Sequence, residues 1–389
     1  MNANASQRSP RPAPVDVTAP RIPGGGTWDW WLLGASVILA GFGLLMILSA
    51  SSVQADADFG DALLFVTRQG IGLLLGVLGA VAVLRIPWRW LRRSAWVAWL
   101  GTVISLLLVM TPLGHASGGA ARWLVLGGLR FQPSEVAKVA LVLVLAHYLA
   151  ANAGRIKDVV GTVLPAVGLT APIVFLVLMQ PDFGTTVILV GLLGVLLFLA
   201  GLQWRWLAGF GLVAATGLAM VAVAAPYRLR RLTAFTDPFA DPSDAGYQVV
   251  QGWIAMAQGG LFGRGIGAGV AQSGFLPEAH TDSIAAVVGE ELGAVGWVLM
   301  VALQLVLVWR ATVLADRSRE LFGTLLAGGL AALLGAQAIV NLGVVCGLLP
   351  TKGLVLPFLS YGASAAVMHT VCIGLLLRIG LDNPIRGRS

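Results

Sequence analysis

The sequence predicts an all-α, polytopic integral membrane protein with about ten transmembrane helices and one large extracytoplasmic loop. Hydrophobic residues make up 57% of the 389 residues and charged residues only 11%, whereas soluble domains carry about 25% charge. The mean hydropathy is +0.86. The apolar residues form continuous runs without a period of two, which favours membrane helices over a closed β-barrel.

Ten apolar runs are long enough to cross about 30 Å of hydrocarbon as helices. They cover residues 30–50, 66–84, 94–112, 134–151, 159–180, 184–202, 207–225, 284–309, 321–346 and 360–378. We therefore expect one transmembrane domain at 29–382, between a disordered N-terminal tail at 1–28 and a short C-terminal tail at 383–389. The longest connection, at about 226–283, includes "GYQVVQGWIAMAQGGLFGRGIG", which predicts a short interfacial helix followed by glycine turns. Loops of this length in a compact protein are usually functional or disordered, and we favour function.

The basic residues predict the orientation in the membrane. With a cytoplasmic N-terminus, the cytoplasmic segments hold more than half of the 25 Lys and Arg residues, and the first outer loop, "SSVQADADFGDA", is acidic. Both termini are then cytoplasmic, and the 226–283 loop lies outside. The net charge of +7 and the pI of about 10.1 are thus mostly a topology signal, and we expect no nucleic-acid partner.

Charged residues within apolar runs are costly and indicate candidate functional sites. Glu135 and Lys138 are three residues apart in the run 134–151, so they share a helix face and can pair. This pair is either a structural ion pair or the polar wall of a cavity, near Arg122 in the preceding segment. Asp182, between two runs, is either a turn and cap residue or part of the same site.

The stretch "LPEAHTDS" places Glu278, His280 and Asp282 directly before the run 284–309. An aspartate in this position is a normal helix N-cap, and it is also a candidate base at the membrane boundary. Two further carboxylates, in "GEELG" at 289–293, point to different helix faces. At most one of them shares a face with Asp282, and we expect the other to have a partner in a neighbouring helix.

The ordered motifs of the chain resemble those of the SEDS family (shape, elongation, division and sporulation), bacterial membrane glycosyltransferases that polymerise lipid II into peptidoglycan. The resemblance covers about residues 30–382, and within the family it is nearer to the division members than to the elongation members. The motifs are "GAARW", "QPSEVAK", "QPDFGTT", "GYQ", "GRGIG", "LPEAHTD", "GEELG", "LLPTKG" and "LPFLSYG".

The resemblance implies a reaction in which a sugar hydroxyl attacks an anomeric carbon and displaces a lipid pyrophosphate. One carboxylate acting as base is sufficient for such a displacement, which inverts the anomeric centre. Asp282 is the implied catalytic base. The implied substrate-binding residues are Arg122, Gln132, Glu135, Lys138, Asp182, Tyr247, Gln248, His280, Lys352 and Ser360. Tyr247 and Gln248 either contact a sugar or hold the loop down.

The implied environment is the cytoplasmic membrane at the division septum. The implied partners are lipid II, a class B penicillin-binding transpeptidase and other division proteins. A divalent cation, Mg²⁺ or Mn²⁺, can assist at the pyrophosphate, although no metal site made by protein alone is evident. Two alternatives remain open: a lipid II flippase or transporter, and a non-catalytic division scaffold.

The chain also departs from the family pattern. Where the family has "HTDFIFA", this chain has "HTDSIAA", with Ser283, Ala285 and Ala286; where the family has "SYGGSS", it has "SYGASAA", with Ala363 in place of a glycine. The first change shrinks a wall beside the candidate base, and the second stiffens a turn.

Overall fold

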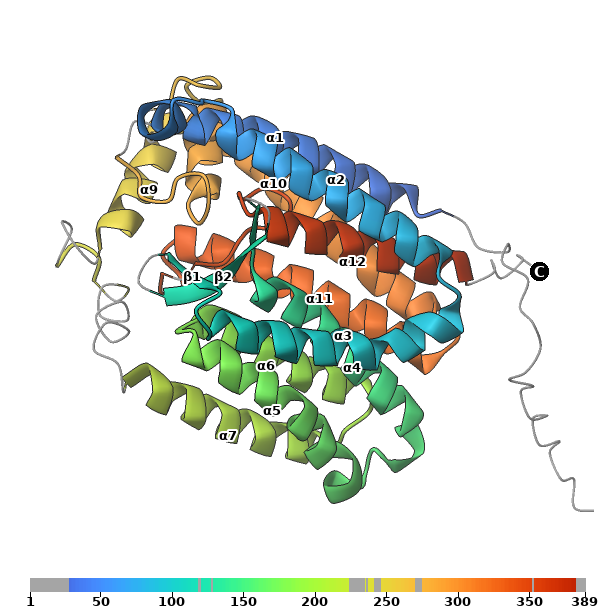
Figure 1. Cartoon of the computed structure of the whole chain (residues 1–389). Helices are drawn as coiled ribbons and strands as arrows, with labels where there is room; N and C mark the ends of the chain where they lie inside the picture. Colours follow the sequence, from blue (N-terminus) through green and yellow to red (C-terminus); the bar gives the residue numbers. More distant parts are fainter. Residues whose placement is uncertain are drawn as a thin grey trace, which may run out of the picture.

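The computed structural model (Figure 1) describes residues 28–117, 120–126, 129–223, 235, 237–240, 246–269, 275–351 and 353–382. The predicted tails, except for Trp28, lie outside this part of the chain. So do Lys352 and several stretches of the predicted outer loop.

Ten apolar helices run through the described residues, in agreement with the ten predicted spans. They are α1 (Trp30–Phe59), α2 (Leu64–Arg85), α3 (Trp88–Val109), α4 (Pro133–Ala151), α5 (Leu164–Met179), α6 (Phe183–Leu199), α7 (Trp204–Val223), α10 (Ile284–Arg317), α11 (Leu321–Val345) and α12 (Ala363–Asp382). A 3-10 turn, η1 (Ala153–Arg155), and a π turn, η2 (Val159–Val163), precede α5. Nine of these spans, with η2 counted into α5, are long and apolar enough to cross a membrane, and α6 is a shorter apolar helix.

Helices α4, α11 and α12 form the centre of the bundle. In the most apolar window of α4, 72% of the residues are buried, against 6% in α7. Helix α12 packs along α2, α11 packs along α10, and α10 also packs along α1. A polar side chain on the central helices is therefore surrounded by protein, which lowers the cost of holding it within the bundle.

Several helix starts follow from local chemistry. Pro133 stands in the first turn of α4, where its missing N–H costs nothing. Asp29 caps α1 by accepting from the amide of Leu32 at 3.0 Å, and it also pairs with Arg310 of α10 at 2.7 Å. This pair fastens α1 to α10 at the end of α10 that is remote from Asp282.

One end of the bundle, here called the loop end, contains the segments in which the sequence predicts functional residues. It holds helix α9 (Tyr247–Gly259), the segment 275–283 and the connection 346–362. It also holds a three-stranded antiparallel sheet of β1 (Gly114–Ser117), β2 (Ala120–Leu126) and β3 (Leu129–Phe131), which the sequence analysis did not predict (Figure 1). The predicted short helix in the long loop is confirmed by α9, which packs against α10.

Candidate functional site

Asp282 lies in a closed turn that leads into α10. The amides of Thr281 and Ser283 both donate to the carbonyl of Glu278, each at 3.1 Å. Glu278 has a φ of 51°, a left-handed conformation that is uncommon for a residue other than glycine. Helix α10 begins at Ile284, and Ser283, the residue after Asp282, is in the N-cap position.

The backbone and the carboxylate of Asp282 are both held by neighbouring elements. The side-chain amide of Asn341, from α11, donates to the carbonyl of Asp282 at 3.1 Å and to the carbonyl of Leu354 at 2.7 Å. A methyl group placed on Gly353 would lie 3.2 Å from Oδ2 of Asp282, so the connection 346–362 packs directly against the carboxylate. The side chain is half-buried, which suits a group that must exchange a proton with a substrate.

The side chain of His280 packs beside this turn. The residue is 9% exposed, and its ring packs against those of Phe65, with centroids 4.5 Å apart, and Tyr361, 5.6 Å apart; these two rings also contact each other at 5.0 Å. The carbonyl of His280 accepts from the amide of Tyr361 at 2.8 Å. Burial lowers the pKa of His280, and the charge of Glu278 acts in the opposite direction. The neutral imidazole therefore supports the turn that carries Asp282.

Arg68 and Arg130, which are not among the substrate-binding residues that the resemblance implies, lie near Tyr361. Burial raises the pKa of Tyr361, while the positive charges of Arg68 and Arg130 and a hydrogen bond from Arg68 act in the opposite direction. The neighbouring side chain of Gln69 holds the same loop, because it donates to the carbonyl of Ser360 at 3.3 Å and accepts from the amide of Gly362 at 3.0 Å. The only sequence signal for Arg68 was its position as a basic residue near the predicted outer end of a span.

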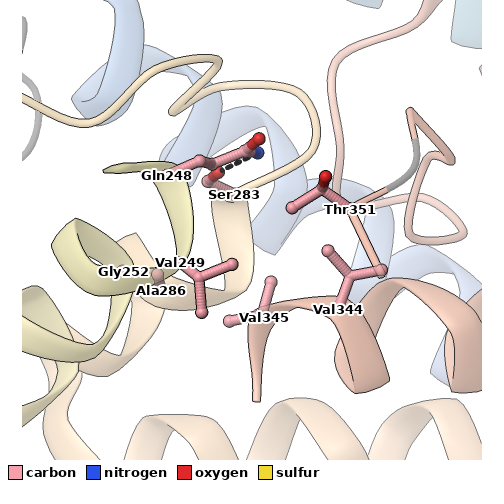
Figure 2. Close-up of a pocket in the computed structure, with 8 residues that line it drawn as sticks. All are labelled: Gln248, Val249, Gly252, Ser283, Ala286, Val344, Val345 and Thr351. Atoms are coloured by element: carbon pink, nitrogen blue, oxygen red, sulfur yellow. Dashed lines mark hydrogen bonds between the residues drawn. The ribbon is translucent and has the colours of Figure 1, made fainter. Parts of the chain in front are cut away.

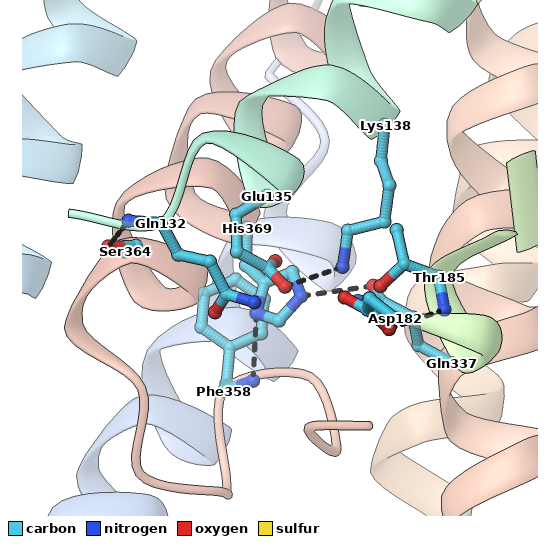
Figure 3. Close-up of polar contacts among 9 residues, drawn as sticks. All are labelled: Gln132, Glu135, Lys138, Asp182, Thr185, Gln337, Phe358, Ser364 and His369. Atoms are coloured by element: carbon cyan, nitrogen blue, oxygen red, sulfur yellow. Dashed lines mark hydrogen bonds and ion pairs between the residues drawn. The ribbon is translucent and has the colours of Figure 1, made fainter. Parts of the chain in front are cut away.

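A second polar cluster lies deeper, between α4, α6, α11 and α12 (Figure 3). Lys138 donates to Glu135 at 2.7 Å, and the two side chains are 1% and 7% exposed, which confirms the predicted pair. His369 of α12 lies 3.1 Å from Gln337 of α11, and it accepts from the amide of Phe358 at 3.5 Å. Neither His369 nor Gln337 was selected from the sequence.

The remaining predicted residues of this region make local contacts. Asp182 caps α6 by accepting from the amide of Thr185 at 3.1 Å, which confirms the cap interpretation. Arg122 donates to the carbonyls of Gln180, at 3.0 Å, and Pro181, at 2.7 Å, so it holds the turn before Asp182.

Gln132 and Ser360 also help to shape the loop end. The backbone amide of Gln132 donates to the hydroxyl of Ser364 at 3.0 Å, and the hydroxyl of Ser360 accepts from the amide of Leu356 at 2.9 Å. The side chain of Gln132 is half-buried and that of Ser360 is buried.

The connection 346–362 joins the two clusters. Gly353 contacts the Asp282 carboxylate, and the next residue, Leu354, lies against the start of α6: a methyl group on Gly184 would be 3.3 Å from its Cγ. Asp282 and the start of α6, which Asp182 caps, thus contact adjacent residues of the same connection, although about 100 residues separate them in the sequence. The structure does not describe the predicted cation in this connection, Lys352.

The two carboxylates of "GEELG" have partners on different elements, as their adjacent positions predicted. Ser49 of α1 donates to both oxygens of Glu291, at 2.6 and 2.8 Å, and Arg264 pairs with Glu290 at 3.6 Å. Helix α10 kinks directly after them at Gly293, whose φ of 66° and close approach to the backbone of Leu261 exclude a side chain. These acidic residues hold α1, α10 and the "GRGIG" loop together.

The first turn of helix α9 contacts Ser283, the residue that follows Asp282. Tyr247 begins the helix and is half-buried, and the side-chain amide of Gln248 donates to the hydroxyl of Ser283 at 3.0 Å. A small cavity lies below this pair, lined mostly by Val249, Ala286, Val344 and Val345 (Figure 2). Of the two open interpretations, the contact of Gln248 favours holding the loop.

Within the described residues, no group of three His, Cys, Asp or Glu side chains is arranged to hold a metal ion. A divalent cation near Asp282 would therefore need most of its ligands from a bound substrate and water.

Comparisons with known proteins agree with this architecture. The sequence model of the family described as "Cell cycle protein" (FTSW_RODA_SPOVE) matches residues 30–383. A probable peptidoglycan glycosyltransferase FtsW of Geobacter sp. (strain M18) is 41% identical over 353 residues, which cover 90% of this chain and 96% of the relative. A protein of the same name from Nitrosococcus halophilus (strain Nc4) is 41% identical over 362 residues, or 91% of this chain and 92% of the relative.

Two solved structures are also similar. A chain from a study of the structural coordination of polymerization and crosslinking by a peptidoglycan synthase complex superposes with a TM-score of 0.76 at 32% identity, covering 92% of this chain and 98% of that one. The rod shape determining protein RodA of Thermus thermophilus superposes with a TM-score of 0.69 at 31% identity, with the same coverage of 92% and 98%.

Proposed function

The chain belongs to the FtsW/RodA/SpoVE family of cell cycle proteins and is a peptidoglycan glycosyltransferase, and we propose that it polymerises lipid II with Asp282 as the catalytic base. The observation that carries the proposal is the setting of Asp282. Its half-buried carboxylate lies against Gly353, and its backbone is held by Asn341. A base fixed in this way is prepared to act on a substrate bound along the connection 346–362.

The reaction is one displacement. A hydroxyl of the acceptor sugar attacks the anomeric carbon of the donor, a new C–O glycosidic bond forms, and the bond from that carbon to the pyrophosphate oxygen breaks. The hydroxyl proton passes to Asp282, and the lipid pyrophosphate leaves with the bonding electron pair. Because one carboxylate acts as a base and forms no covalent intermediate, the product has the inverted configuration.

The leaving pyrophosphate carries negative charge that needs compensation. The positive charges of Arg68 and Arg130 act on Tyr361, whose ring packs against His280 of the Asp282 turn. In this proposal they bind the pyrophosphate of the donor. The buried pair of Glu135 and Lys138 and the α6 cap Asp182 belong to the deeper polar cluster (Figure 3), which the connection 346–362 reaches through the packing of Leu354 against Gly184.

A divalent cation is compatible with this arrangement but is not required by the proposed mechanism. Asp282 is the residue that would contact it, and the ion would supply further positive charge at the pyrophosphate. No step above depends on it.

We place the loop end at the outer face of the cytoplasmic membrane, with both termini cytoplasmic, because the basic residues favour that orientation. The similarity to a chain of a peptidoglycan synthase complex that coordinates polymerization and crosslinking supports a crosslinking partner, a class B penicillin-binding transpeptidase. The FtsW name of the curated relatives supports a role at the septum with other division proteins.

The test is polymerisation by the purified full chain, reconstituted in vesicles with lipid II and its cognate transpeptidase. We expect glycan chains from the wild type and a loss of about 10²- to 10⁴-fold for Asp282→Asn, which keeps the shape and removes the base. Normal polymerisation by Asp282→Asn would refute the role of Asp282. Transfer of labelled lipid II across the vesicle without polymer would favour a flippase, and binding of the transpeptidase with neither activity would favour a scaffold.

A further inference from the structure

Ser283 stands where serine usually caps a helix, yet its hydroxyl does not cap α10. An N-cap serine normally accepts from an amide in the first turn of its helix, and no such bond is present here. The hydroxyl instead takes part in two bonds to other segments. It accepts from Nε2 of Gln248 at 3.0 Å and donates to the carbonyl of Pro277 at 3.2 Å.

These two bonds connect helix α9 to the turn that carries Asp282. Ser283 is 3% exposed, so water competes little for its hydroxyl. Pro277 opens the turn and Ser283 closes it, while the amide of Ser283 also donates to the carbonyl of Glu278 at 3.1 Å. Asp282 is therefore fixed on two sides: by Asn341 through its own carbonyl, and by Gln248 through the next residue.

We propose that Ser283 and Gln248 are positioning residues for Asp282, through the hydrogen-bond chain from Gln248 to Ser283 to Pro277. This inference rests on the proposed function, because it assumes that Asp282 is the base. It also gives a role to Ser283, the first residue at which this chain departs from the "HTDF" pattern. Where the family pattern has an aromatic ring beside the base, this chain has a hydroxyl that fastens α9 to the turn.

The cavity beside Gln248 and Ser283 allows the hydroxyl of Ser283 to be tested separately from the volume of its side chain. It is lined by Gln248, Val249, Gly252, Ser283, Ala286, Val344, Val345 and Thr351 (Figure 2). It has room for about one water-sized group. Threonine at position 283 keeps the hydroxyl, and its extra methyl group can enter this space. Alanine at 283 removes both bonds without adding volume.

The experiment measures kcat and KM for lipid II with the reconstituted full chain and its transpeptidase, for Ser283→Ala, Ser283→Thr, Gln248→Met and the double variant Ser283→Ala/Gln248→Met. A neutral hydrogen bond contributes modestly, so we expect kcat to fall about 5- to 10-fold for Ser283→Ala and for Gln248→Met. We expect KM to stay within about twofold, since neither group contacts substrate in this proposal. Ser283→Thr should retain the activity of the wild type.

The double variant decides whether the two residues act as a unit. Because each single change breaks the same chain, we expect the double variant to be no slower than the slower single variant. Ser94→Ala, which removes a hydroxyl bonded at 2.8 Å to the carbonyl of Leu91 in α3, is the control and should leave kcat unchanged. Unfolding midpoints measured in parallel show that the variants are folded, and Gln248→Met keeps the test valid if Ser283→Ala does not fold.

The proposal is overturned if the losses in kcat multiply in the double variant, if Ser283→Ala is as fast as the wild type, or if Gln248→Met changes KM alone. The last result would mean that Gln248 contacts the substrate. The wild type and Asp282→Asn in the same assay report separately on the proposed function: if Asp282→Asn loses activity while the Ser283 and Gln248 variants do not, only this inference fails.

Discussion

The side-chain amide of Asn341 lies 3.1 Å from the backbone carbonyl of Asp282 and 2.7 Å from that of Leu354. Asn341 is 1% exposed on the central helix α11. One buried side chain thus joins the residue that carries the candidate base to the connection that covers its carboxylate. The geometry of the site therefore depends on a polar group within an apolar helix.

Replacing Asn341 with leucine should reduce catalysis more than its effect on folding explains. Asn341→Leu leaves two carbonyls without their donor, at a cost of about 1–3 kcal/mol in the free energy of unfolding. The freed turn lets Asp282 shift, and a displacement of about 1 Å can lower kcat about 10²-fold. Polymerisation kinetics and thermal unfolding of the same preparation measure both effects.

Gln304→Leu is the matched control for Asn341→Leu. Gln304 also donates a buried bond to the connection 346–362, at 2.8 Å to the carbonyl of Pro357, but this bond does not involve the Asp282 turn. We expect a similar loss of stability and a much smaller loss of kcat. Equal losses of kcat in the two variants would show that the connection as a whole, and not the position of Asp282, controls the rate.

The elements that the sequence predicted correctly are those with a local cause. Continuous apolar runs give the ten helices, the spacing of Glu135 and Lys138 gives their ion pair, and Asp182 precedes the helix that it caps. The helices follow from continuous segments, and the ion pair and the cap each join residues only a few positions apart. The sequence pattern is therefore sufficient to predict them.

What the sequence could not predict depends on contacts between distant segments. The electrostatic partners Arg68 and Tyr361 are far apart in the chain, and nothing local in "FVTRQG" indicates that Arg68 lies near Tyr361. Nothing beside Asn341 in its apolar run indicates which segments it bonds, and His369 and Gln337 meet only because α11 packs against α12. The sheet was missed because its strands are short, three to seven residues, and lack a clear alternation.

His280 should make the stability of the protein depend on pH in the mildly acidic range. Burial lowers its pKa in the folded protein, whereas the unfolded chain titrates near 6.5. As the pH falls below about 7, the unfolded state takes up a proton that the folded state resists, so stability present above pH 6.5 is progressively lost. The facing groups are Glu278, which opposes the shift, and Tyr361, which titrates far above this range.

His280→Phe tests this dependence, since phenylalanine keeps an aromatic ring packed against Phe65 and Tyr361 and has no proton to gain. We expect the unfolding midpoint of the wild type to fall more than that of His280→Phe between pH 7.5 and 5.5. His115→Gln, at an exposed histidine, is the control and should follow the wild type. Parallel curves for the wild type and His280→Phe would contradict the prediction.

Arg68 and Arg130 should affect substrate affinity more than the chemical step. If they bind the pyrophosphate, Arg68→Gln and Arg130→Gln should each raise the KM for lipid II about 3- to 10-fold, a modest figure because Arg130 is exposed and Arg68 half-buried. The increase should shrink at high salt, which screens the same interaction. Arg93→Gln, on α3 and beside Trp90, is the control. An unchanged KM for both variants would exclude these arginines from the pyrophosphate site.

Removing one charge of the Glu135–Lys138 ion pair should destabilise the protein strongly, whereas removing both charges should destabilise it little. Lys138→Met leaves the carboxylate of Glu135 buried without its cation, at a cost of about 3–5 kcal/mol in the free energy of unfolding. Glu135→Leu/Lys138→Met removes both charges and should recover most of that stability. The partly exposed pair of Arg92 and Glu320, 3.6 Å apart, is the control: Arg92→Gln should cost at most about 1 kcal/mol. If the double variant is stable but polymerises no lipid II, the pair is also needed for activity; if it is both stable and active, the pair is structural alone. A single variant as stable as the wild type would contradict the buried pairing itself.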